Sequence, residues 1–308
     1  MYNNKKYKDK RVFKLKKSTE KARILTEALP YIQKFHNKTF VIKFGGSIMR
    51  NLEAKQAFIE DVVLLNLVGI KIIIVHGGGP EITERIEKIG IKTEFIDGLR
   101  KTDSEVIEVA EMVLAGRINK EIAHLVNSMG GRAVGLSGKD GNLIKATKKK
   151  IYKEEKEIDL GYVGDVEKID KKILEDLIDL GYIPIISPIG FGADGETYNI
   201  NADFVASAVS GELKAEKLVL MTDVEGLYRD FENKKGFITA MTSAEAKELI
   251  ETKAIAGGML PKLTCSAAAV ERGTKNVHIL DGRVEHSLLI EVLTDKGIGT
   301  MIHGGEAK

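Results

Sequence analysis

Six short runs rich in valine and isoleucine, separated by longer stretches with helical spacing, are the feature that most limits what this chain can fold into. Most of the runs are closed by Gly, Pro or Asp, as β-strands commonly are. Strands that alternate with helices form mainly parallel sheets. We therefore predict an α/β protein with a mainly parallel central sheet. The predicted strands are Thr39–Phe44, Lys71–Val75, Arg132–Leu136, Ile183–Pro188, Lys217–Met221 and Asn276–Leu280.

Helical patterns fill the intervals between these runs. The motif Thr102-x-x-Glu105 has the form of a capping box and predicts the start of the longest helix. Residues 140–170 are polar and show little strand pattern, so we expect hairpins or loops at the rim of the sheet. The predicted helices are Leu52–Val68, Glu81–Ile89, Ser104–Asn127, Lys171–Leu180, Ala202–Ser210, Ser243–Thr252 and Leu260–Arg272.

The composition describes a globular chain with a basic beginning. Of 308 residues, 43% are hydrophobic and 30% charged, and no apolar run is long enough for a membrane span. The single cysteine, Cys265, excludes an internal disulfide framework, fits a reducing, cytoplasmic location and favours a packing role. Residues 1–17 form a lysine-rich tail that we expect to be mobile and solvated. Because no aromatic–basic pattern continues into the fold, we expect no nucleic-acid partner.

Glycine clusters follow the first two predicted strands. Gly45 and Gly46 close the first strand, and residues 77–79 close the second, with Pro80 at a favourable first helical position. Ligands of such sheets bind beyond the carboxyl ends of the strands, where glycine permits close approach and helix N-termini offer N–H groups to an anion. Tight strand-to-helix turns also need glycine, so a purely structural role remains open for each cluster.

Two lysines far apart in the sequence lie in glycine-rich surroundings. Lys43 ends a strand inside an apolar run, and Lys262 begins a helix, where a cation is unfavourable unless an anion lies nearby. With Asp203 near the start of another helix, they suggest one site that gathers positive charge around a transferring phosphoryl group. A surface position for Lys43 and a capping role for Asp203 remain open alternatives.

Other motifs that bind nucleotides or carry hydrolysis fail on inspection. Residues 190–195 fit the Gly-x-Gly-x-x-Gly dinucleotide fingerprint but lead into no helix, so we interpret them as a loop. No Gly-x-Ser-x-Gly elbow exists, and Gly138-Lys139 is followed by Asp140 instead of Ser or Thr, which excludes a Walker loop. No His or Cys cluster has zinc-ligand spacing. Phosphate chemistry without a Walker loop remains.

An ordered set of motifs in this chain is similar to the amino acid kinase family. The resemblance covers roughly residues 20–303 and is strongest to the branch that acts on N-acetylglutamate. It implies a three-layer αβα sandwich, with an N-terminal lobe over 38–195 for the acetylated amino acid and a C-terminal lobe over 196–308 for ATP and arginine. The motifs are Lys43-Phe-Gly-Gly, His76-Gly-Gly-Gly-Pro, Asp97-Gly-Leu-Arg100, Asn199-x-Asn-Ala-Asp203, Leu220-Met-Thr-Asp-Val-Glu-Gly226 and Gly257-Gly-Met-Leu-Pro-Lys262.

The resemblance implies ATP-dependent phosphorylation of the γ-carboxylate of N-acetyl-L-glutamate in arginine biosynthesis. Because that carboxylate is already ionised at neutral pH, attack needs no general base, and His76 is interpreted as structural. Mg²⁺ would be carried on the nucleotide phosphates, and no metal site of the protein is predicted. Lys43 and Lys262 would stabilise the transition state, with Asp203 holding both ammonium groups. The implied substrate-binding residues are Gly78, Gly79, Arg100 and Asn199, and the implied nucleotide-binding residues are Gly45, Gly46, Thr222, Asp223, Gly226 and Met259.

The segment before the first strand predicts a kinked helix over 18–37. Apolar residues recur there at helical spacing, from Leu25 to Phe35, and Pro30 predicts the kink. The stripe could pack on its own domain or on a partner subunit. With the tail that begins at His286, the segment resembles the arginine-inhibited subtype, in which these helices join dimers into a hexamer, a trimer of dimers. The implied arginine contacts are Lys217, His278, Glu291 and Gly297.

The sequence is compatible with two other functions. A kinase that acts on acetylaminoadipate or on another amino acid would share most of this machinery and differ by about one methylene of pocket length. A non-catalytic protein that senses arginine or a nucleotide could use the same fold. The presence of Lys43, Lys262 and Asp203 counts against the second alternative.

Overall fold

The computed structural model describes residues 18–305 except 97, 154–155, 231–232, 253–254, 256 and 296. The basic tail predicted over 1–17 and Asp97 of the Asp-Gly-Leu-Arg motif therefore lie outside the described residues. Among the residues described, no helix is both long enough and apolar enough to cross a membrane.

All six predicted strands are present, and they lie in one sheet of eight strands in the order β14-β16-β15-β11-β1-β2-β8-β5. Every neighbouring pair is parallel except β15 and β16. The prediction of a mainly parallel sheet is confirmed. The strands are β1 (Thr39–Phe44), β2 (Lys71–His76), β5 (Ala133–Ser137), β8 (Ile183–Ser187), β11 (Lys217–Thr222), β14 (Ala240–Thr242), β15 (Asn276–Asp281) and β16 (Thr300–His303).

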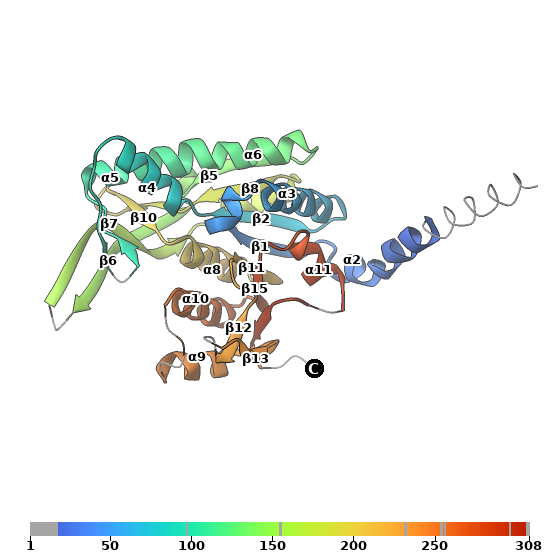
Figure 1. The fold of residues 1–308 in the computed structure, drawn as a ribbon. Helices are drawn as coiled ribbons and strands as arrows, with labels where there is room; N and C mark the ends of the chain where they lie inside the picture. Colours follow the sequence, from blue (N-terminus) through green and yellow to red (C-terminus); the bar gives the residue numbers. More distant parts are fainter. Residues whose placement is uncertain are drawn as a thin grey trace, which may run out of the picture.

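Helices cover both faces of this sheet and give three layers (Figure 1). Along β1, Phe40, Ile42 and Phe44 enter one core and Val41 enters the other, because successive side chains of a strand point to opposite faces. The first core is covered by α3 (Leu52–Leu67), α4 (Gly79–Lys88), α5 (Ser104–Glu111), α6 (Asn119–Ser128) and α11 (Ser287–Leu293). The second is covered by α7 (Lys172–Asp179), α8 (Ala202–Glu212), α9 (Ser243–Glu251) and α10 (Met259–Glu271).

The longest predicted helix differs from its prediction in two ways. A π-helical stretch, η2 (Met112–Ile118), separates α5 from α6. The predicted capping box is wrong, since Asp103 caps α5 by accepting from Val106 N at 2.9 Å. Thr102 lies one residue before this N-cap, and its buried hydroxyl donates to the Arg100 carbonyl at 2.8 Å.

The prediction for residues 140–170 is right about a hairpin and wrong about the scarcity of strand. β6 (Ile144–Lys153) and β7 (Lys156–Ile169) form a long antiparallel hairpin that closes a small barrel with β9 (Ile189–Gly192) and β10 (Thr197–Ile200). Charged pairs such as Lys145–Glu167 and Lys149–Asp165 line the hairpin, so its strands lack the apolar alternation of a half-buried sheet. The interpretation of residues 190–195 as a loop is partly right, because Gly195 lies in the turn between β9 and β10 whereas Gly190 and Gly192 belong to β9. The motif is followed by strand β10 instead of the helix that the dinucleotide fingerprint would require.

The N-terminal segment extends away from the body of the molecule as the blue arm of Figure 1. Helical turns over 18–27 stop at Ala28, and helix α2 (Leu29–Phe35) follows with Pro30 in its first turn. Phe35 is buried and meets Phe40 edge-on at 5.3 Å between ring centroids. Leu25 and Leu29 are 74% and 50% exposed, so the apolar stripe does not pack completely on its own chain.

Short elements complete the described chain. Two two-stranded sheets are formed by β3 (Phe95–Ile96) with β4 (Leu99–Arg100), and by β12 (Leu227–Asp230) with β13 (Lys235–Ile238). The 3-10 turns are η1 (Gly46–Arg50) and η3 (Asp140–Asn142).

Candidate active site

Three charged side chains that are distant in the sequence meet at the carboxyl edge of the sheet. Lys43 is the penultimate residue of β1, which lies between β11 and β2. Asp203 belongs to the first turn of α8, and Lys262 to the first turn of α10, the helix that packs against α8. Ligands of parallel sheets bind at this edge, outside the carboxyl ends of the strands.

Asp203 bridges the two lysines. Its Oδ1 lies 2.9 Å from Lys43 Nζ, and its Oδ2 accepts a hydrogen bond from Lys262 Nζ at 2.7 Å. Both contacts are close ion pairs, and the one to Lys262 also has the geometry of a hydrogen bond. The side chains of Lys43 and Asp203 are 12% and 7% exposed.

The charge balance of this cluster favours an anion. Burial raises the pKa of Asp203, but the ammonium groups of Lys43 and Lys262 more than offset this and lower the pKa from 3.8 to about 2. The carboxylate is therefore ionised at neutral pH. Two cations and one anion leave an excess of positive charge in a nearly buried position, where electrostatic interactions are strong.

The alternatives left open by the sequence are excluded for both residues. Asn201, and not Asp203, caps α8, because the Asn201 side chain accepts from the Asp203 amide at 2.8 Å. The Asp203 carboxylate is thereby free to hold the lysines. Sequence reasoning missed the role of Asn201, although an asparagine directly before a helix with an acidic first turn is a recognisable capping signal. Lys43 is not a surface lysine, because it is largely buried in the ion pair.

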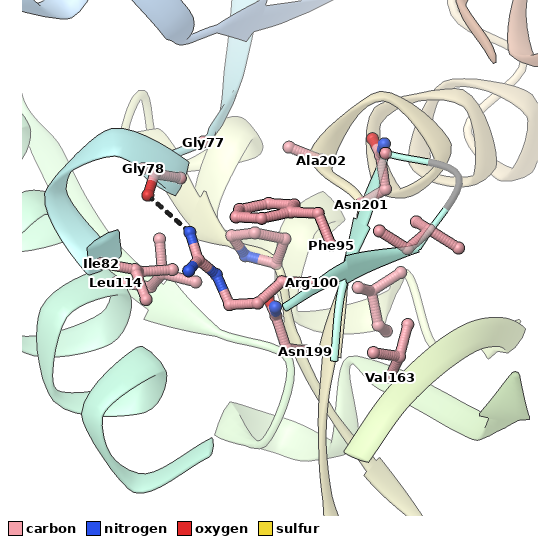
Figure 2. Close-up of a pocket in the computed structure, with 15 residues that line it drawn as sticks. Gly77, Gly78, Ile82, Phe95, Arg100, Leu114, Val163, Asn199, Asn201 and Ala202 are labelled. Atoms are coloured by element: carbon pink, nitrogen blue, oxygen red, sulfur yellow. Dashed lines mark hydrogen bonds between the residues drawn. The ribbon is translucent and has the colours of Figure 1, made fainter. Parts of the chain in front are cut away.

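A cavity of about 210 Å³ lies at the same edge, below the turn between β2 and α4. Figure 2 shows that Arg100 from β4 points toward this turn and that Asn199 enters from β10. All four predicted substrate residues line the cavity, so the structure brings them together. Its lining is Gly77, Gly78, Gly79, Ile82, Phe95, Gly98, Leu99, Arg100, Leu114, Val163, Pro188, Asn199, Ile200, Asn201 and Ala202.

Of the two terminal nitrogens of the Arg100 guanidinium, one makes hydrogen bonds within the chain and the other has no hydrogen-bond partner among the described residues. Nη2 donates to the Gly79 carbonyl at 3.0 Å and to Thr83 Oγ1 at 2.6 Å, and the guanidinium carbon lies 4.5 Å from the centre of the Phe95 ring. Nη1 is buried and has no partner among the described residues. Burial lowers the pKa of Arg100, yet a guanidinium remains charged in proteins. An unpaired buried donor is costly, and a carboxylate in the cavity would satisfy it.

Two residues with potential catalytic chemistry serve the structure instead. His76 is fully buried, and burial lowers its pKa from 6.5 to about 4, so the ring is neutral near pH 7. Cys265 is buried in α10, and burial raises the pKa of its thiol. Neither group can serve readily as a base or nucleophile in these surroundings, which agrees with the interpretation made from the sequence.

The predicted nucleotide residues lie at the same carboxyl edge. Gly45 and Gly46 follow β1, and Gly46 has a φ of +67°, a conformation that favours glycine. Thr222 ends the neighbouring strand β11, with Asp223 directly after it, and Met259 opens α10 three residues before Lys262. Gly226 precedes β12. Their role in ATP binding stays a prediction.

The four predicted arginine contacts form one network at the opposite edge of the sheet, where β11 begins. Lys217 Nζ donates to His278 Nε2 at 2.7 Å, and His278 Nδ1 donates to Glu291 Oε1 at 2.6 Å. Glu291 Oε2 accepts from the amide of Ile298 at 2.8 Å, next to Gly297. A Cβ on Gly297 would lie 3.0 Å from both Glu291 oxygens, so glycine fits this position best.

This network adjoins the N-terminal arm. Lys217 Nζ lies 5.3 Å from the centre of the Phe35 ring in α2. Burial lowers the pKa of Lys217 from 10.5 to about 8, although the Glu291 carboxylate opposes that shift. Burial also raises the pKa of Glu291, but the hydrogen bond from His278 reverses the direction and the pKa is lower than usual.

Comparison with known proteins agrees with this arrangement. The sequence model of the amino acid kinase family matches residues 38–281, and the chain belongs to this family. It is 53% identical, over 92% of its length, to a protein named acetylglutamate kinase from Caldanaerobacter subterraneus subsp. tengcongensis, of which it covers 93%. A second acetylglutamate kinase, from Heliobacterium modesticaldum, is 52% identical over 93% of this chain and 99% of its own length. These relatives identify the chain as a kinase, and hence as an enzyme that uses ATP.

Solved structures confirm the fold. The N-acetylglutamate synthase from Neisseria gonorrhoeae, complexed with coenzyme A and N-acetylglutamate, matches with a TM-score of 0.80 at 28% identity over 93% of this chain and 64% of that one. The same synthase complexed with coenzyme A and L-arginine matches with a TM-score of 0.74 at 26% identity over 92% of this chain and 65% of that one. Carbamate kinase from Giardia lamblia bound to AMP-PNP matches with a TM-score of 0.61 at 16% identity over 87% and 99%, which shows the fold alone.

Proposed function

We propose that this chain transfers the γ-phosphoryl group of ATP to the γ-carboxylate of N-acetyl-L-glutamate, forming N-acetyl-L-glutamyl 5-phosphate in arginine biosynthesis. The observation that carries the proposal is the Asp203 bridge between Lys43 and Lys262, which lies beside a cavity that contains an unpaired nitrogen of Arg100. The names of the relatives at about half identity support the same substrate.

The reaction brings the acceptor carboxylate up to the negatively charged phosphates of ATP. The charged residues of the site would offset the repulsion between these two anions. The acceptor carboxylate is ionised at neutral pH and needs no general base. Lys43 and Lys262 would stabilise the charge that spreads over the equatorial oxygens of the phosphoryl group in the transition state. Asp203 would keep both ammonium groups converged while leaving the excess of positive charge that an anion requires.

Different residues of the cavity would bind different groups of the substrate. Arg100 would pair with the α-carboxylate through its free nitrogen, since a guanidinium matches the geometry of a carboxylate. Asn199 would bind the polar acetamido group, and the amides of Gly78 and Gly79 would hold the reacting end.

ATP would lie against Gly45 and Gly46 and along Thr222, Asp223, Gly226 and Met259. The residues that the structure describes contain no group of three or more His, Cys, Asp or Glu side chains placed to hold a metal ion. Mg²⁺ would arrive on the nucleotide phosphates, where it would supply positive charge, and the residues of this chain would bind the complex of metal and nucleotide.

We also propose that arginine inhibits the enzyme by binding among Lys217, His278, Glu291 and Gly297. Glu291 is the main anchor, because a buried guanidinium needs a carboxylate partner. The gonococcal synthase, a relative of the same fold, has been solved with L-arginine, which supports a ligand of this kind.

We further propose that the N-terminal arm joins dimers into a hexamer, a trimer of dimers. Its exposed Ile24 and Leu25 border a cavity of about 750 Å³ that Leu289 and Leu293 of α11 close on the other side. Deletion of residues 1–37 should convert hexamers into dimers on a sizing column. An unchanged mass would refute the assembly through the arm.

One assay tests the function and its alternatives. ATP-dependent hydroxamate formation would be measured with acetylglutamate, acetylaminoadipate, glutamate and aspartate, each with and without arginine. We expect the highest kcat/KM with acetylglutamate and inhibition by arginine. Preference for acetylaminoadipate would assign the alternative kinase activity, and absence of turnover on every acceptor would leave a sensor protein.

A further inference from the structure

We propose that His76 and Asn119 are positioning residues, which together aim the amide of Gly78 into the substrate cavity. The proposal rests on the proposed function, because it assigns a task to two buried residues of the same site that touch neither substrate nor nucleotide.

The contacts of His76 define a single arrangement of its protons. Its Nδ1 lies 2.9 Å from the Gly77 carbonyl oxygen, which can only accept, so Nδ1 carries the hydrogen and donates. Its Nε2 is then an acceptor, and Asn119 Nδ2 donates to it at 3.2 Å. His76 thus acts as a rigid link between an asparagine in α6 and the backbone of the glycine turn.

The orientation of the Asn119 amide is fixed independently of His76. Asn119 Nδ2 also donates to the Ile185 carbonyl at 2.7 Å, and its second hydrogen faces both His76 Nε2 and the Leu136 carbonyl, each at 3.2 Å. Asn119 Oδ1 accepts from Lys120 Nζ at 3.1 Å. An amide turned the other way would place its NH₂ group against the ammonium of Lys120 and its oxygen against a carbonyl. Asn119 therefore determines which tautomer His76 adopts.

That tautomer sets the direction of the peptide between Gly77 and Gly78. In a trans peptide the C=O and N–H groups point to opposite sides, and no described peptide bond is cis. A Gly77 carbonyl held toward His76 consequently turns the Gly78 N–H away from His76. Gly77 and Gly78 both line the cavity, and the Gly78 amide has no acceptor within the described chain. A donor oriented before the reaction stabilises developing negative charge at no cost of reorganisation.

The π-helical stretch η2 supports the same turn from its other side. A Cβ on Gly78 would lie 2.4 Å from Ile118 Cδ1 and 2.7 Å from Leu114 Cδ2, so η2 packs directly on the Gly78 backbone. Asn119 is the next residue after η2. One segment thus presses on Gly78 and also supplies the amide that orients His76, in keeping with the frequent occurrence of π-helical turns at functional sites.

His76 can keep this role over the working range of pH. Burial lowers its pKa to about 4, the hydrogen bond to Gly77 opposes that shift, and the positive charge of Lys120 adds to it. The ring therefore stays neutral above pH 5, with one donor and one acceptor.

The first test compares His76→Leu with His76→Asn. Leucine removes the donor, whereas asparagine can place an amide N–H near the position of Nδ1. We expect kcat to fall at least tenfold in His76→Leu, with an unchanged KM for ATP, and to stay within about threefold of the wild type in His76→Asn. A purely structural role predicts lower thermal midpoints in both variants with an unchanged kcat per folded site, and that result would overturn the proposal.

The second test uses Asn119→Asp, which has nearly the same shape. This variant also loses the donation to the Ile185 carbonyl, so the readout is the pH dependence of kcat in the folded fraction and not its magnitude. The new carboxylate can only accept, so His76 Nε2 must carry a hydrogen to bond to it. A neutral ring has only one N–H group, so its Nδ1 would then have no hydrogen and would face the Gly77 carbonyl with a lone pair. A protonated ring donates from both nitrogens and keeps the turn in place, and the carboxylate raises the pKa of His76. The kcat of this variant should therefore be highest at low pH and fall as the pH rises through the new pKa of His76. The wild type should show no such step.

The outcomes separate this inference from the proposed function. If the wild type fails to phosphorylate acetylglutamate, the proposed function is wrong. If the wild type is active and Asn119→Asp keeps the wild-type pH profile in its folded fraction, measured by active-site titration, the positioning role is wrong.

Discussion

The sheet carries a buried charge cluster at each edge, and the two clusters are built in opposite ways. At the carboxyl edge, Lys43 and Lys262 share the single carboxylate of Asp203, and positive charge is in excess. At the amino edge, Lys217 and a neutral His278 face Glu291, whose second oxygen is satisfied by backbone amides. The first cluster is incomplete without an anion, and the second is complete within the chain.

The two clusters also differ in their buried side-chain atoms that lack hydrogen-bond partners. Two of the five buried side-chain atoms without a hydrogen bond among the described residues, Arg100 Nη1 and the ion-paired Asp203 Oδ1, belong to the predicted site at the carboxyl edge. The other three are Glu81 Oε2, Thr93 Oγ1 and Ser187 Oγ. Lys217, His278 and Glu291 contribute none. Buried polar atoms are normally paired, so unpaired ones indicate where a ligand completes the structure. A ligand at the amino edge must instead displace existing bonds, which suits a regulator that shifts an equilibrium.

Removal of a cation from the incomplete cluster should have the largest effect. Lys262→Ala should lower kcat by about 10²-fold or more, as expected for the loss of a group that stabilises transition-state charge. Steady-state kinetics would be compared with Lys172→Ala, whose side chain is 74% exposed on α7 and which should behave as the wild type. An increase in KM with an unchanged kcat would contradict the role assigned to Lys262.

Arg100→Lys should weaken substrate binding more than chemistry. A lysine cannot bond to the Gly79 carbonyl and to a carboxylate with the same fork geometry, and a charge-assisted hydrogen bond contributes about 1.5–3 kcal/mol. We expect the KM for acetylglutamate to rise roughly tenfold or more, with the KM for ATP unchanged. Equal increases in both KM values would contradict a specific role of Arg100 in binding acetylglutamate.

At the complete cluster, Glu291→Gln should abolish regulation. A neutral amide cannot form an ion pair with a guanidinium, so the arginine concentration for half inhibition should rise at least tenfold. The ratio of rates with and without arginine, measured within each variant, is the readout, and Glu285→Gln is the matched control on the exposed loop before α11. Retained inhibition in Glu291→Gln would move the arginine site elsewhere.

The smallest effect concerns pH and stability at the amino edge. Because burial lowers the pKa of Lys217 from 10.5 to about 8, the folded state binds fewer protons than the unfolded state between these values. The free energy of unfolding should therefore rise with pH in that window, by at most about 1.4 kcal/mol per pH unit. Urea titrations at pH 7.5 to 10.5 should show this slope in the wild type and a flatter one in Lys217→Met. Equal slopes would mean that Lys217 is solvated.

The strands were predictable because they are buried on both faces, so each reads as a continuous apolar run such as residues 39–44. The strands of the β6–β7 hairpin were not predictable, because paired charged side chains replace the apolar residues that mark a strand. The capping box at Thr102 failed for a different reason. Two neighbouring residues could each cap the helix, and the chain begins α5 one residue later, with Asp103 as the cap.

Within the site, the sequence identified the residues but not how they divide their tasks. Motif resemblance singled out Lys43, Asp203 and Lys262, yet the sequence alone left Asp203 as an equally good helix cap. The structure assigns the cap to Asn201. The π-helical stretch before Asn119 leaves no recognisable periodic signal, so the link from Asn119 to His76 could only be seen in three dimensions.

The amino-acid sequence by itself determined the α/β class, the strands and the chemistry that each motif offers, because burial and backbone conformation are encoded locally. The tertiary structure decided which of these groups meet. Lys43, Asp203 and Lys262 converge because the strand order places β1 at the centre of the sheet and brings the N-termini of α8 and α10 together beyond its end. Such proximity depends on how distant segments pack, and packing is a property of the whole chain that no single motif contains.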